Sequence, residues 1–517
     1  MSTNEQPGSG TDDGLDELTD RSARARRTRE GRPVDAQGSR QWRQVWRTHF
    51  YAGVFSVPIV VLLALTGLVI LYTEPIQRAL DADVLVVEPE SERLPYDELA
   101  AAAAQEFPER SIDAVTTPRQ RDSSVAFAMS TADGEDSIDV YVDPYTAEVL
   151  GTRTAGWGLV GLANRLHGTL NNETVTVPLP TMAGVIGDGP VVQHLALGDI
   201  VVEIFAVWAL VLAISGVYLW WPRSNETGRP RFAPRIRRGG RARWRDLHAI
   251  PGVVLSVILV FLVVSGVPWS GWWGGGWWEV AERVSPGTPT EEPASVVART
   301  GDLDRFGTQI PWSTQNRQVP ASSGPEVGEA MPAPLSLDRV ARAAAEEDMR
   351  PGYRIAMPVD GTDDAGNPIH GTYVLTNYWP AGTQDARTVY LDQFSGTQLA
   401  VSEVYDFGPV GTATDYAIST HMGTQFGLVN RIVMTFACVA LLWSVISASV
   451  MYAKRRRSGL GLPRRPKDLG VARRLGVIAI AIGIVFPLWG VTALAILAFD
   501  HYVIQRVPRL RHAFGQR

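Results

Sequence analysis

The sequence predicts an α-helical integral membrane protein of about five transmembrane helices, internally duplicated, with two small extracytoplasmic α+β domains. Three observations predict this class. The 517 residues concentrate their apolar side chains in five long runs. Each run approaches the roughly 20 residues that a helix needs to cross about 30 Å of hydrocarbon. Arginine is concentrated between some runs and not others, and the two longest polar segments repeat one another in pattern.

The five apolar runs set the expected membrane spans. The first run follows a long polar tail over 1–45, which we expect to be disordered and cytoplasmic. Since no small-residue cleavage site follows this run, it is predicted to be a retained anchor. The last run contains Pro487 and Gly490, so a re-entrant hairpin is the alternative there. The expected spans are 46–72, 195–221, 247–270, 421–453 and 476–499.

The arginines orient these spans. The segments 222–246 and 454–475 are strongly basic. By the positive-inside bias both lie in the cytoplasm, together with the N-terminus. The long polar segments that follow the first and third spans are then extracytoplasmic, and a short tail over 500–517 ends the chain. We expect membrane lipid as a partner and no nucleic acid.

The two outer segments share a pattern of elements. Each begins with an acid at a predicted helix start, Asp97 or Asp338, followed by alanine-rich helix formers. Each continues with strand alternation and an aspartate turn, at Asp143 or Asp392. We therefore expect α+β domains over 73–165 and 334–420, an outer connecting segment over 166–194, and a tryptophan-rich rim and linker over 271–333.

Several chemistries are excluded or unsupported. The only cysteine, Cys438, lies in an apolar run, which excludes an internal disulfide, a thiolate zinc cluster and a cysteine-ligated iron–sulfur centre. No G-x-G-x-x-G tract follows a strand and opens a helix, so we expect no NAD domain, and no flavin domain is evident. No H-x-x-x-H or H-E-x-x-H spacing supports a mononuclear metal site. No general acid or nucleophile is predicted.

Two matching tracts carry histidine at the mouth of a span. Each places a histidine about one helical turn before a glycine, so a duplicated unit brings His49 and His248 to the same depth. Neutral imidazoles on two helices can approach one haem iron from opposite faces. We expect Gly53 and Gly252 to give the macrocycle room, whereas a headgroup anchor is the alternative role for either histidine. The tracts are Trp46-Arg-Thr-His49-Phe-Tyr-Ala-Gly53 and Trp244-Arg-Asp-Leu-His248-Ala-Ile-Pro-Gly252.

A second histidine pair is predicted at the outer end. His167 and His421 occupy matching places after their respective outer domains. His194, however, stands directly at the outer mouth of the second span and competes with His167. We rank His421 first, His167 second and His194 third as outer haem ligands. The sequence leaves open which of the last two binds, and whether an outer haem exists.

Other polar or aromatic residues near the spans have less distinctive expected roles. Glu203 lies within the second span. We expect it either to carry a proton or a hydrogen bond near a haem, or to form a hydrogen bond between two helices. We assign the pairs Thr66-Gly67 and Ser265-Gly266 to close helix packing. The tryptophan-rich tract 268–278 is predicted to form an interfacial belt, a stacking rim for a chelate or haem edge, or both.

Several motifs in order resemble the PepSY-associated transmembrane family over roughly residues 42–500. They are the tyrosine-aspartate turn strands, the histidine-led runs and the tract Gly216-Val-Tyr-Leu-Trp-Trp-Pro-Arg223. That family includes bacterial iron-regulated inner-membrane proteins and ferric-siderophore reductases. The resemblance implies PepSY-like outer domains on a multi-pass protein of the bacterial cytoplasmic membrane, with two haem b groups. As haem iron ligands it implies His49, His248, His421 and His167.

The activity implied by the resemblance is electron transfer outward. A ferric-reductase-type oxidoreductase would take electrons from a cytoplasmic reductase or from quinol and reduce a ferric siderophore, or other extracytoplasmic Fe(III), in iron uptake. Two other classes remain open: a non-enzymatic PepSY envelope-binding or regulatory protein, and a siderophore or iron transport accessory. The sequence also leaves open the siderophore, the oligomeric state, and whether copper or an envelope disulfide is reduced instead.

Overall fold

The computed structural model describes most of the chain after the N-terminal tail. Most of the predicted tail and most of the two arginine-rich loops, including Arg223 to Arg238 and Arg456 to Arg465, lie outside the described residues. The described residues are 2, 36–134, 136–154, 156, 158–172, 174–182, 184, 191–222, 240–285, 294–300, 302–303, 310–315, 317–324, 330–377, 382–455 and 469–513.

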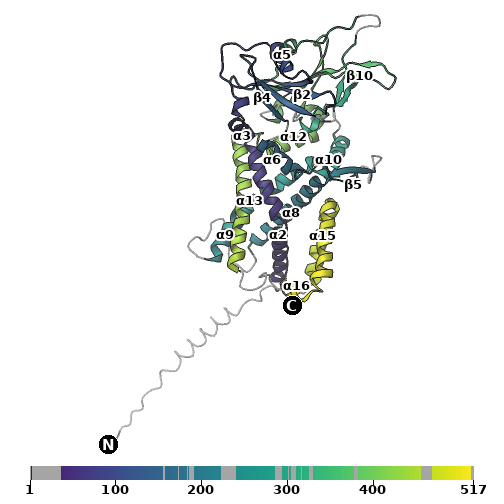
Figure 1. Cartoon of the computed structure of the whole chain (residues 1–517). Coiled ribbons are helices and arrows are strands. Elements are labelled where there is room, and N and C mark those ends of the chain that lie inside the picture. Colours follow the sequence, from purple (N-terminus) through teal and green to yellow (C-terminus); the bar gives the residue numbers. More distant parts are fainter. Residues whose placement is uncertain are drawn as a thin grey trace.

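Four long helices form a closed bundle beneath a β-sheet (Figure 1). Around the bundle, each packs against the next in the order α2, α8, α9, α13 and back to α2. Long helices of this kind satisfy every backbone N–H and C=O internally, as a hydrocarbon surrounding requires. With a fifth segment, Pro487–Ile504, the described residues include five helices able to cross a membrane, so the chain is a membrane protein. The four helices are α2 (Ala36–Leu71), α8 (Leu197–Trp220), α9 (Arg241–Gly266) and α13 (Gly427–Arg455).

The last apolar run differs from the single span predicted over 476–499. It forms α14 (Leu469–Val485) and α15 (Pro487–Phe499), which pack on each other. A Cβ built on Gly490 would lie 3.0 Å from the Cα of Gly483, whereas seven residues of one helix would span about 10 Å. The chain therefore folds back here, as in the hairpin alternative. Pro487 supports the break because it has no N–H and cannot continue the preceding helix.

The outer segments contribute to one eight-stranded antiparallel sheet, not to two separate sheets as the prediction of two domains assumed. Its order is β14-β13-β12-β9-β1-β2-β3-β4, so each segment supplies one half. The halves join where β1 pairs with β9, with buried Val115 opposite buried Ile355. The strands are β1 (Arg110–Thr116), β2 (Val125–Thr131), β3 (Ser137–Val142), β4 (Val149–Thr154), β9 (Tyr353–Ala356), β12 (Thr372–Asn377), β13 (Arg387–Asp392) and β14 (Gln398–Glu403).

Two helices, α5 (Tyr96–Glu106) and α11 (Leu337–Glu346), pack on this sheet and on each other. Their apolar residues, with those of both sheet halves, form one continuous core. The predicted helix-start acids cap each other's helices: Asp97 Oδ1 accepts from Leu337 N at 2.8 Å, and Asp338 Oδ1 accepts from Tyr96 N at 2.7 Å. A carboxylate at a helix start satisfies otherwise unpaired N–H groups. These exchanged caps connect the two segments.

Shorter elements flank the sheet and the bundle, and some of them lie between the two. They include two small helices after α2, a helix before each of α8 and α13, a tryptophan-rich helix after α9, and three two-stranded sheets. Their bounds are α3 (Thr73–Leu80), α4 (Ala82–Leu85), α6 (Gly158–Gly168), α10 (Gly271–Val284), α12 (Gly408–His421), α16 (Pro508–Ala513), β5 (Thr176–Pro180), β6 (Val192–Ala196), β7 (Ala294–Arg299), β8 (Gln318–Pro320), β10 (Gly361–Thr362), β11 (Pro368–Ile369), η1 (Val267–Trp269), η3 (Trp312–Thr314), η4 (Thr383–Asp385), η5 (Val404–Phe407) and η6 (Asp500–Ile504).

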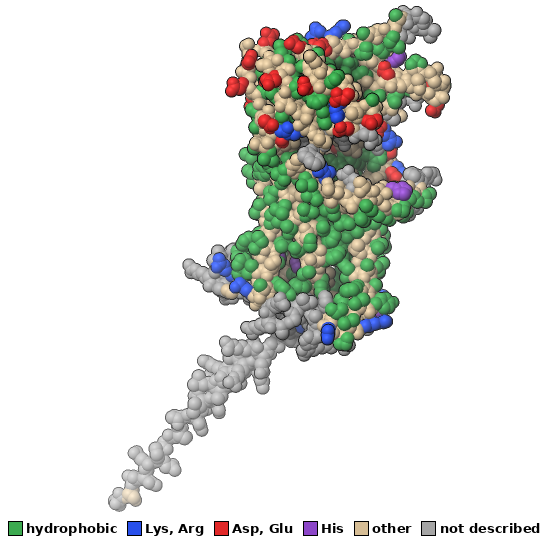
Figure 2. Space-filling model, viewed as in Figure 1, with side chains coloured by type: hydrophobic (Ala, Val, Ile, Leu, Met, Phe, Trp, Pro, Cys, Tyr) green, Lys and Arg blue, Asp and Glu red, His purple; other side chains and the backbone are tan. Residues whose placement is uncertain are grey.

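Side chains divide the molecule into zones. Acidic groups gather over the sheet, apolar groups cover the bundle, and basic groups flank the end of the bundle far from the sheet (Figure 2). We call the end where α2 finishes and α8 begins the sheet end. We call the opposite end, where α2 begins and α8 finishes, the basic end. Exposed Arg243 and Arg245 near the start of α9, and Lys454 near the end of α13, lie there.

Candidate functional site

Two histidines face each other across the bundle near the basic end. The ring centroids of His49 on α2 and His248 on α9 are 6.4 Å apart, with ring planes at 82°. A metal–nitrogen bond is about 2.0 Å, and a ring nitrogen lies about 1.1 Å from the ring centre, so two imidazoles on opposite sides of one metal have centroids about 6.2 Å apart. The observed separation matches the space that a single iron between the rings requires.

The neighbouring helices hold both rings through Nδ1. His49 Nδ1 lies 2.8 Å from Ser215 Oγ on α8. His248 Nδ1 lies 3.1 Å from Ser447 Oγ and 3.1 Å from the backbone oxygen of Ser444, both on α13. Metal-ligating histidines almost always use the other ring nitrogen in such a contact, which orients the ring. Within the described residues, the hydrogen bonds of both rings are made by Nδ1, so Nε2 of each ring can bind a ligand.

The sheet end holds a second pair of histidines. His167 on α6 and His421 at the end of α12 are near enough for their charges to interact. His167 Nδ1 lies 2.9 Å from Thr66 Oγ1 on α2, and His421 Nδ1 lies 2.9 Å from Ser265 Oγ on α9. His194 takes no part in this arrangement, because it lies exposed on β6, opposite Pro178 of β5. The structure thus brings His167, and not His194, towards His421.

The two pairs lie near opposite ends of the bundle. Residues 49 and 66 of α2 are 17 positions apart, as are residues 248 and 265 of α9. At about 1.5 Å of rise per residue, either interval covers about 25 Å along the helix. That length is most of the roughly 30 Å thickness of the hydrocarbon layer. The two pairs therefore lie about 25 Å apart along the helices that carry or contact them.

Three glycines other than Gly53 and Gly252 lie directly beside histidine rings. A Cβ built on Gly216 would lie 3.3 Å from His49 Cε1, and on Gly67 it would lie 3.4 Å from His167 Cε1. At Gly266 the corresponding distance to His421 Cε1 is 3.6 Å. The nearest such atom to Gly53 belongs to a leucine at 3.8 Å, and Gly252 meets nothing within 4 Å. The room that these last two glycines are expected to give a macrocycle stays a prediction.

Two of these glycines belong to the hydroxyl–glycine pairs that the sequence assigns to close packing, and their contacts include histidine rings as well as a neighbouring helix. Thr66-Gly67 and Ser265-Gly266 each combine a hydroxyl that contacts a histidine with a glycine that leaves room for its ring. Ser215-Gly216 repeats the combination on α8, and Ser447 is followed by alanine on α13. Sequence reasoning missed Ser215 and Ser447, which a search for hydroxyl-small dipeptides in every span would have found.

The donor set fits haem. In the part of the chain that the structure describes, no group of three or more His, Cys, Asp or Glu side chains could hold a metal ion. Haem iron needs only axial ligands from the protein, since the macrocycle supplies the others. Two opposed imidazoles with tethered Nδ1 atoms meet that need for His49 and His248. The residues present therefore fit a b-type haem at the basic end.

Glu203 stabilises the helix that follows α9. Its Oε2 accepts from the backbone N–H of Trp272 at 2.9 Å and of Trp273 at 3.2 Å, in the first turn of α10. A negative charge at a helix N-terminus is favourable, and the side chain is only 4% exposed. Of the two predicted roles, these contacts support the hydrogen bond between elements.

The indole groups of α10 tie that helix to its surroundings. Trp272 Nε1 donates to Pro180 O at 2.7 Å, and Trp273 Nε1 donates to Val485 O at 2.8 Å. Trp277 Nε1 donates to Thr414 Oγ1 of α12 at 3.0 Å. The tryptophan-rich tract forms η1 and α10 and bonds to the helix carrying His421, while the belt and the stacking rim stay predictions.

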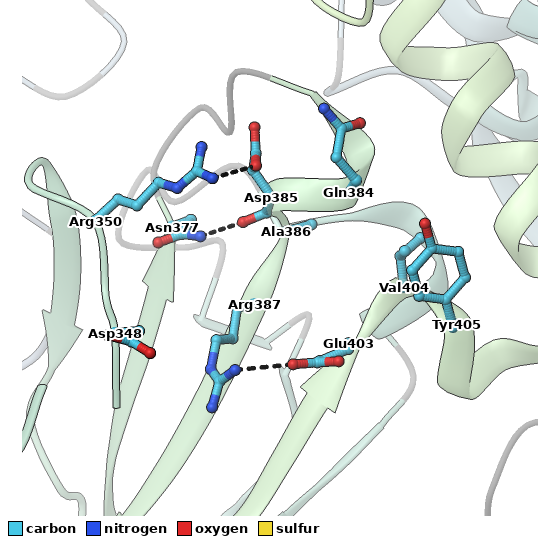
Figure 3. Close-up of a pocket in the computed structure, with 10 residues that line it drawn as sticks. All are labelled: Asp348, Arg350, Asn377, Gln384, Asp385, Ala386, Arg387, Glu403, Val404 and Tyr405. Carbon is cyan, nitrogen blue, oxygen red and sulfur yellow. Dashed lines mark hydrogen bonds and ion pairs between the residues drawn. The ribbon is translucent and has the colours of Figure 1, made fainter. Parts of the chain in front are cut away.

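A polar pocket of about 180 Å³ lies at the edge of the sheet beside η4 and η5 (Figure 3). Charged groups in its lining pair with each other: Arg350 with Asp385 at 2.7 Å, and Arg387 with Glu403 at 2.9 Å. Gln384 accepts from Gln425 Nε2 at 2.9 Å, four residues beyond the histidine that ends α12. The pocket is therefore joined to the segment that follows α12, and its ion pairs connect β13 to β14 and Arg350 to η4.

Comparison with known proteins places the chain in a family. The family model described as PepSY-associated TM region matches residues 46–455, which is most of the chain. The chain belongs to this family, and the resemblance predicted from its motifs is confirmed. The match begins just before His49 and ends where α13 ends, so it includes both histidine pairs. No curated protein matched the chain.

Proposed function

We propose that this member of the PepSY-associated transmembrane family is a di-haem electron-transfer protein. It would reduce ferric siderophores, or other extracytoplasmic Fe(III), in bacterial iron uptake. The observation that carries the proposal is the 6.4 Å separation between the rings of His49 and His248, tethered through Nδ1. Haem b, when bound, supplies a one-electron Fe(III)/Fe(II) couple.

The chain is, in this proposal, an internal duplication of a PepSY-like outer segment with its helices. Three regularities support it: each outer segment supplies half of one sheet, their helices exchange caps, and both histidine-bearing helices place a hydroxyl 17 residues after the histidine. The two predicted PepSY-like domains would then be the two halves of the sheet.

In this proposal each histidine pair holds one haem site. His49 and His248 would hold the site at the basic end, and the positive-inside bias supports a cytoplasmic location for that end. A cytoplasmic reductase or membrane quinol is the proposed electron donor there. His167 and His421 hold the site at the sheet end, beside the extracytoplasmic surface. One electron reduces Fe(III) to Fe(II), which the hard oxygen donors of a siderophore bind less tightly and release.

The visible spectrum of the detergent-purified protein tests the proposal directly. We expect a Soret band that shifts on reduction with dithionite, and two haems per chain by pyridine haemochrome. The double variant His49→Ala with His248→Ala should lose one haem and keep the other. The double variant His167→Ala with His421→Ala should do the converse. His194→Ala, at the exposed histidine of β6, is the matched control and should keep both.

Two results would overturn the proposal. A protein that stays colourless after expression with added haem precursor would favour the envelope-binding or regulatory alternative. Full haem absorbance in both double variants would show that the ligands are wrong. The transport-accessory alternative predicts movement of a ferric chelate into vesicles without any change in haem oxidation state.

Reduction of iron is measured separately from haem binding. The dithionite-reduced protein, freed of reductant, is mixed anaerobically with a ferric hydroxamate chelate and an Fe(II)-specific chromophore. We expect haem reoxidation and one Fe(II) per electron lost. The variant lacking both sheet-end histidines should keep a reducible haem at the basic end but deliver little Fe(II). Equal delivery by that variant would contradict the order of the two sites.

A further inference from the structure

Each of the four imidazoles meets a hydroxyl whose proton is already donated elsewhere. A serine or threonine hydroxyl has one proton to donate. In each case the residue donates to the backbone oxygen four residues earlier in its own helix. The bonds are Thr66 to Leu62 O at 2.8 Å, Ser215 to Val211 O at 2.6 Å, Ser265 to Phe261 O at 2.8 Å and Ser447 to Trp443 O at 2.8 Å.

A backbone carbonyl lies beside each hydroxyl, three residues earlier in the same helix, and one of the four also contacts Nδ1 of its histidine. For His248 it is the oxygen of Ser444, 3.1 Å from Nδ1. For the other three rings the neighbouring carbonyls belong to the residues three positions before the hydroxyl. They are Leu212 for His49, Leu63 for His167 and Leu262 for His421. A carbonyl oxygen can only accept a hydrogen bond, so a ring nitrogen facing it must carry the proton.

The carbonyl contact of His248 requires a proton on its Nδ1 when the ring is neutral, and the matching hydroxyl contacts lead us to infer the same form for the other three rings. In this form Nδ1 carries the hydrogen and donates it to the neighbouring oxygen. Nε2 therefore carries the lone pair, which is the form an iron ligand must have. The four hydroxyl residues are between 0% and 9% exposed, so the contacts lie in a low-dielectric interior where hydrogen bonds are stronger.

We propose that Thr66, Ser215, Ser265 and Ser447 are positioning residues that fix the tautomer of the four histidines and tune the haem reduction potentials. An acceptor on Nδ1–H increases the electron density at Nε2, which favours Fe(III) over Fe(II) and lowers the potential. The inference rests on the proposed function, because haem is the group placed at Nε2. The inference extends the proposed function, because it assigns control of the haem reduction potentials to side chains that contact the histidines and neither haem nor substrate.

The test uses the two hydroxyls at the basic end. Ser215→Ala with Ser447→Ala removes both hydroxyls while leaving the carbonyls. We expect the potential of that haem, measured by spectroelectrochemical titration, to become more positive, and haem affinity to fall by about tenfold. The sheet-end haem should be unchanged. The EPR signal of the oxidised basic-end haem should also move, since the angle between the imidazole planes is no longer fixed.

Two serines serve as matched controls. Ser449 of α13 makes the same kind of bond, to Val445 O at 2.8 Å, but is exposed. Ser256 of α9 bonds Gly252 O at 2.7 Å and is buried. No contact between either serine and an imidazole is recorded among the described residues, so Ser449→Ala and Ser256→Ala should leave both potentials and the EPR signals unchanged. The single variant Ser215→Thr keeps a hydroxyl at this position, so the potential of the basic-end haem should stay close to the wild-type value.

The outcomes separate this inference from the proposed function. A wild-type protein without haem would refute the function itself. A wild-type protein with two haems, together with a serine-to-alanine double variant of unchanged potential and EPR signal, would refute only the positioning role. If the double variant loses the basic-end haem while Ser215→Thr and both controls retain it, the positioning role is supported.

Discussion

The buried carboxyl of Asp415 should make the stability of the protein depend on pH. It lies on α12, six residues before His421, and is 4% exposed. The hydroxyl of Ser313 donates to Asp415 Oδ2, and the backbone N–H of Ser313 donates to Oδ1 at 3.4 Å. Burial raises the pKa of this carboxyl from 3.8 to about 6, and the hydrogen bonds from Ser313 offset part of that rise. The folded protein therefore keeps a proton that the unfolded chain releases.

The sign and size of the pH effect follow from this difference. Because the folded state binds the proton more tightly, the free energy of unfolding falls as pH rises from about 4 to about 6, and the effect is complete above that window. A difference of about 2 units at about 1.4 kcal/mol each amounts to about 3 kcal/mol. Asp415→Asn cannot ionise, so it should remove this part of the pH dependence.

The assay compares thermal unfolding of wild type and Asp415→Asn in detergent between pH 4 and pH 8, followed by tryptophan fluorescence. Between those limits we expect the wild-type midpoint to fall relative to the variant by on the order of 5 °C. Asp364→Asn, exposed in the loop between β10 and β11, is the control and should run parallel to wild type. Parallel curves for wild type and Asp415→Asn would refute the reasoning.

Two further predictions concern the joints between elements. Asp97→Ala or Asp338→Ala removes an exchanged cap and should lower stability by about 1 kcal/mol, seen as a lower thermal midpoint at pH 7. Glu98→Ala is the control, and an effect equal to it would contradict the cap assignment. Gly216→Ala places a methyl 3.3 Å from its histidine and should reduce haem content, whereas Gly266→Ala, at 3.6 Å, should be tolerated. Equal haem content in both glycine variants would refute this ranking.

The membrane class could be predicted because its signals are local. A run of apolar residues near a membrane thickness is visible without knowing its neighbours, and four of the five predicted runs overlap single long helices. The fifth run contains Pro487, which signals a helix break in the sequence and begins α15 in the structure. The pairing of His49 with His248 was also accessible, since identical local tracts at two span mouths imply equal depth.

What escaped prediction depends on contacts between distant residues. Nothing in the strand around Val115 identifies Ile355, 240 residues later, as its neighbour, so two domains were expected where one sheet forms. Asp97 and Asp338 were recognised as helix-start acids, but a cap on another segment's helix has no local signature. Likewise, a serine that bonds its own helix looks the same in sequence whether or not a histidine faces it, which concealed Ser215.

Two kinds of contact relate the two halves of the chain, residues 36–222 and 240–455. Each hydroxyl holds a histidine of its own half: Ser215 holds His49, and Ser447 holds His248. Each histidine pair, in contrast, takes one ring from each half. Each half thus orients its own histidines, whereas an iron bound between two histidines would join the two halves.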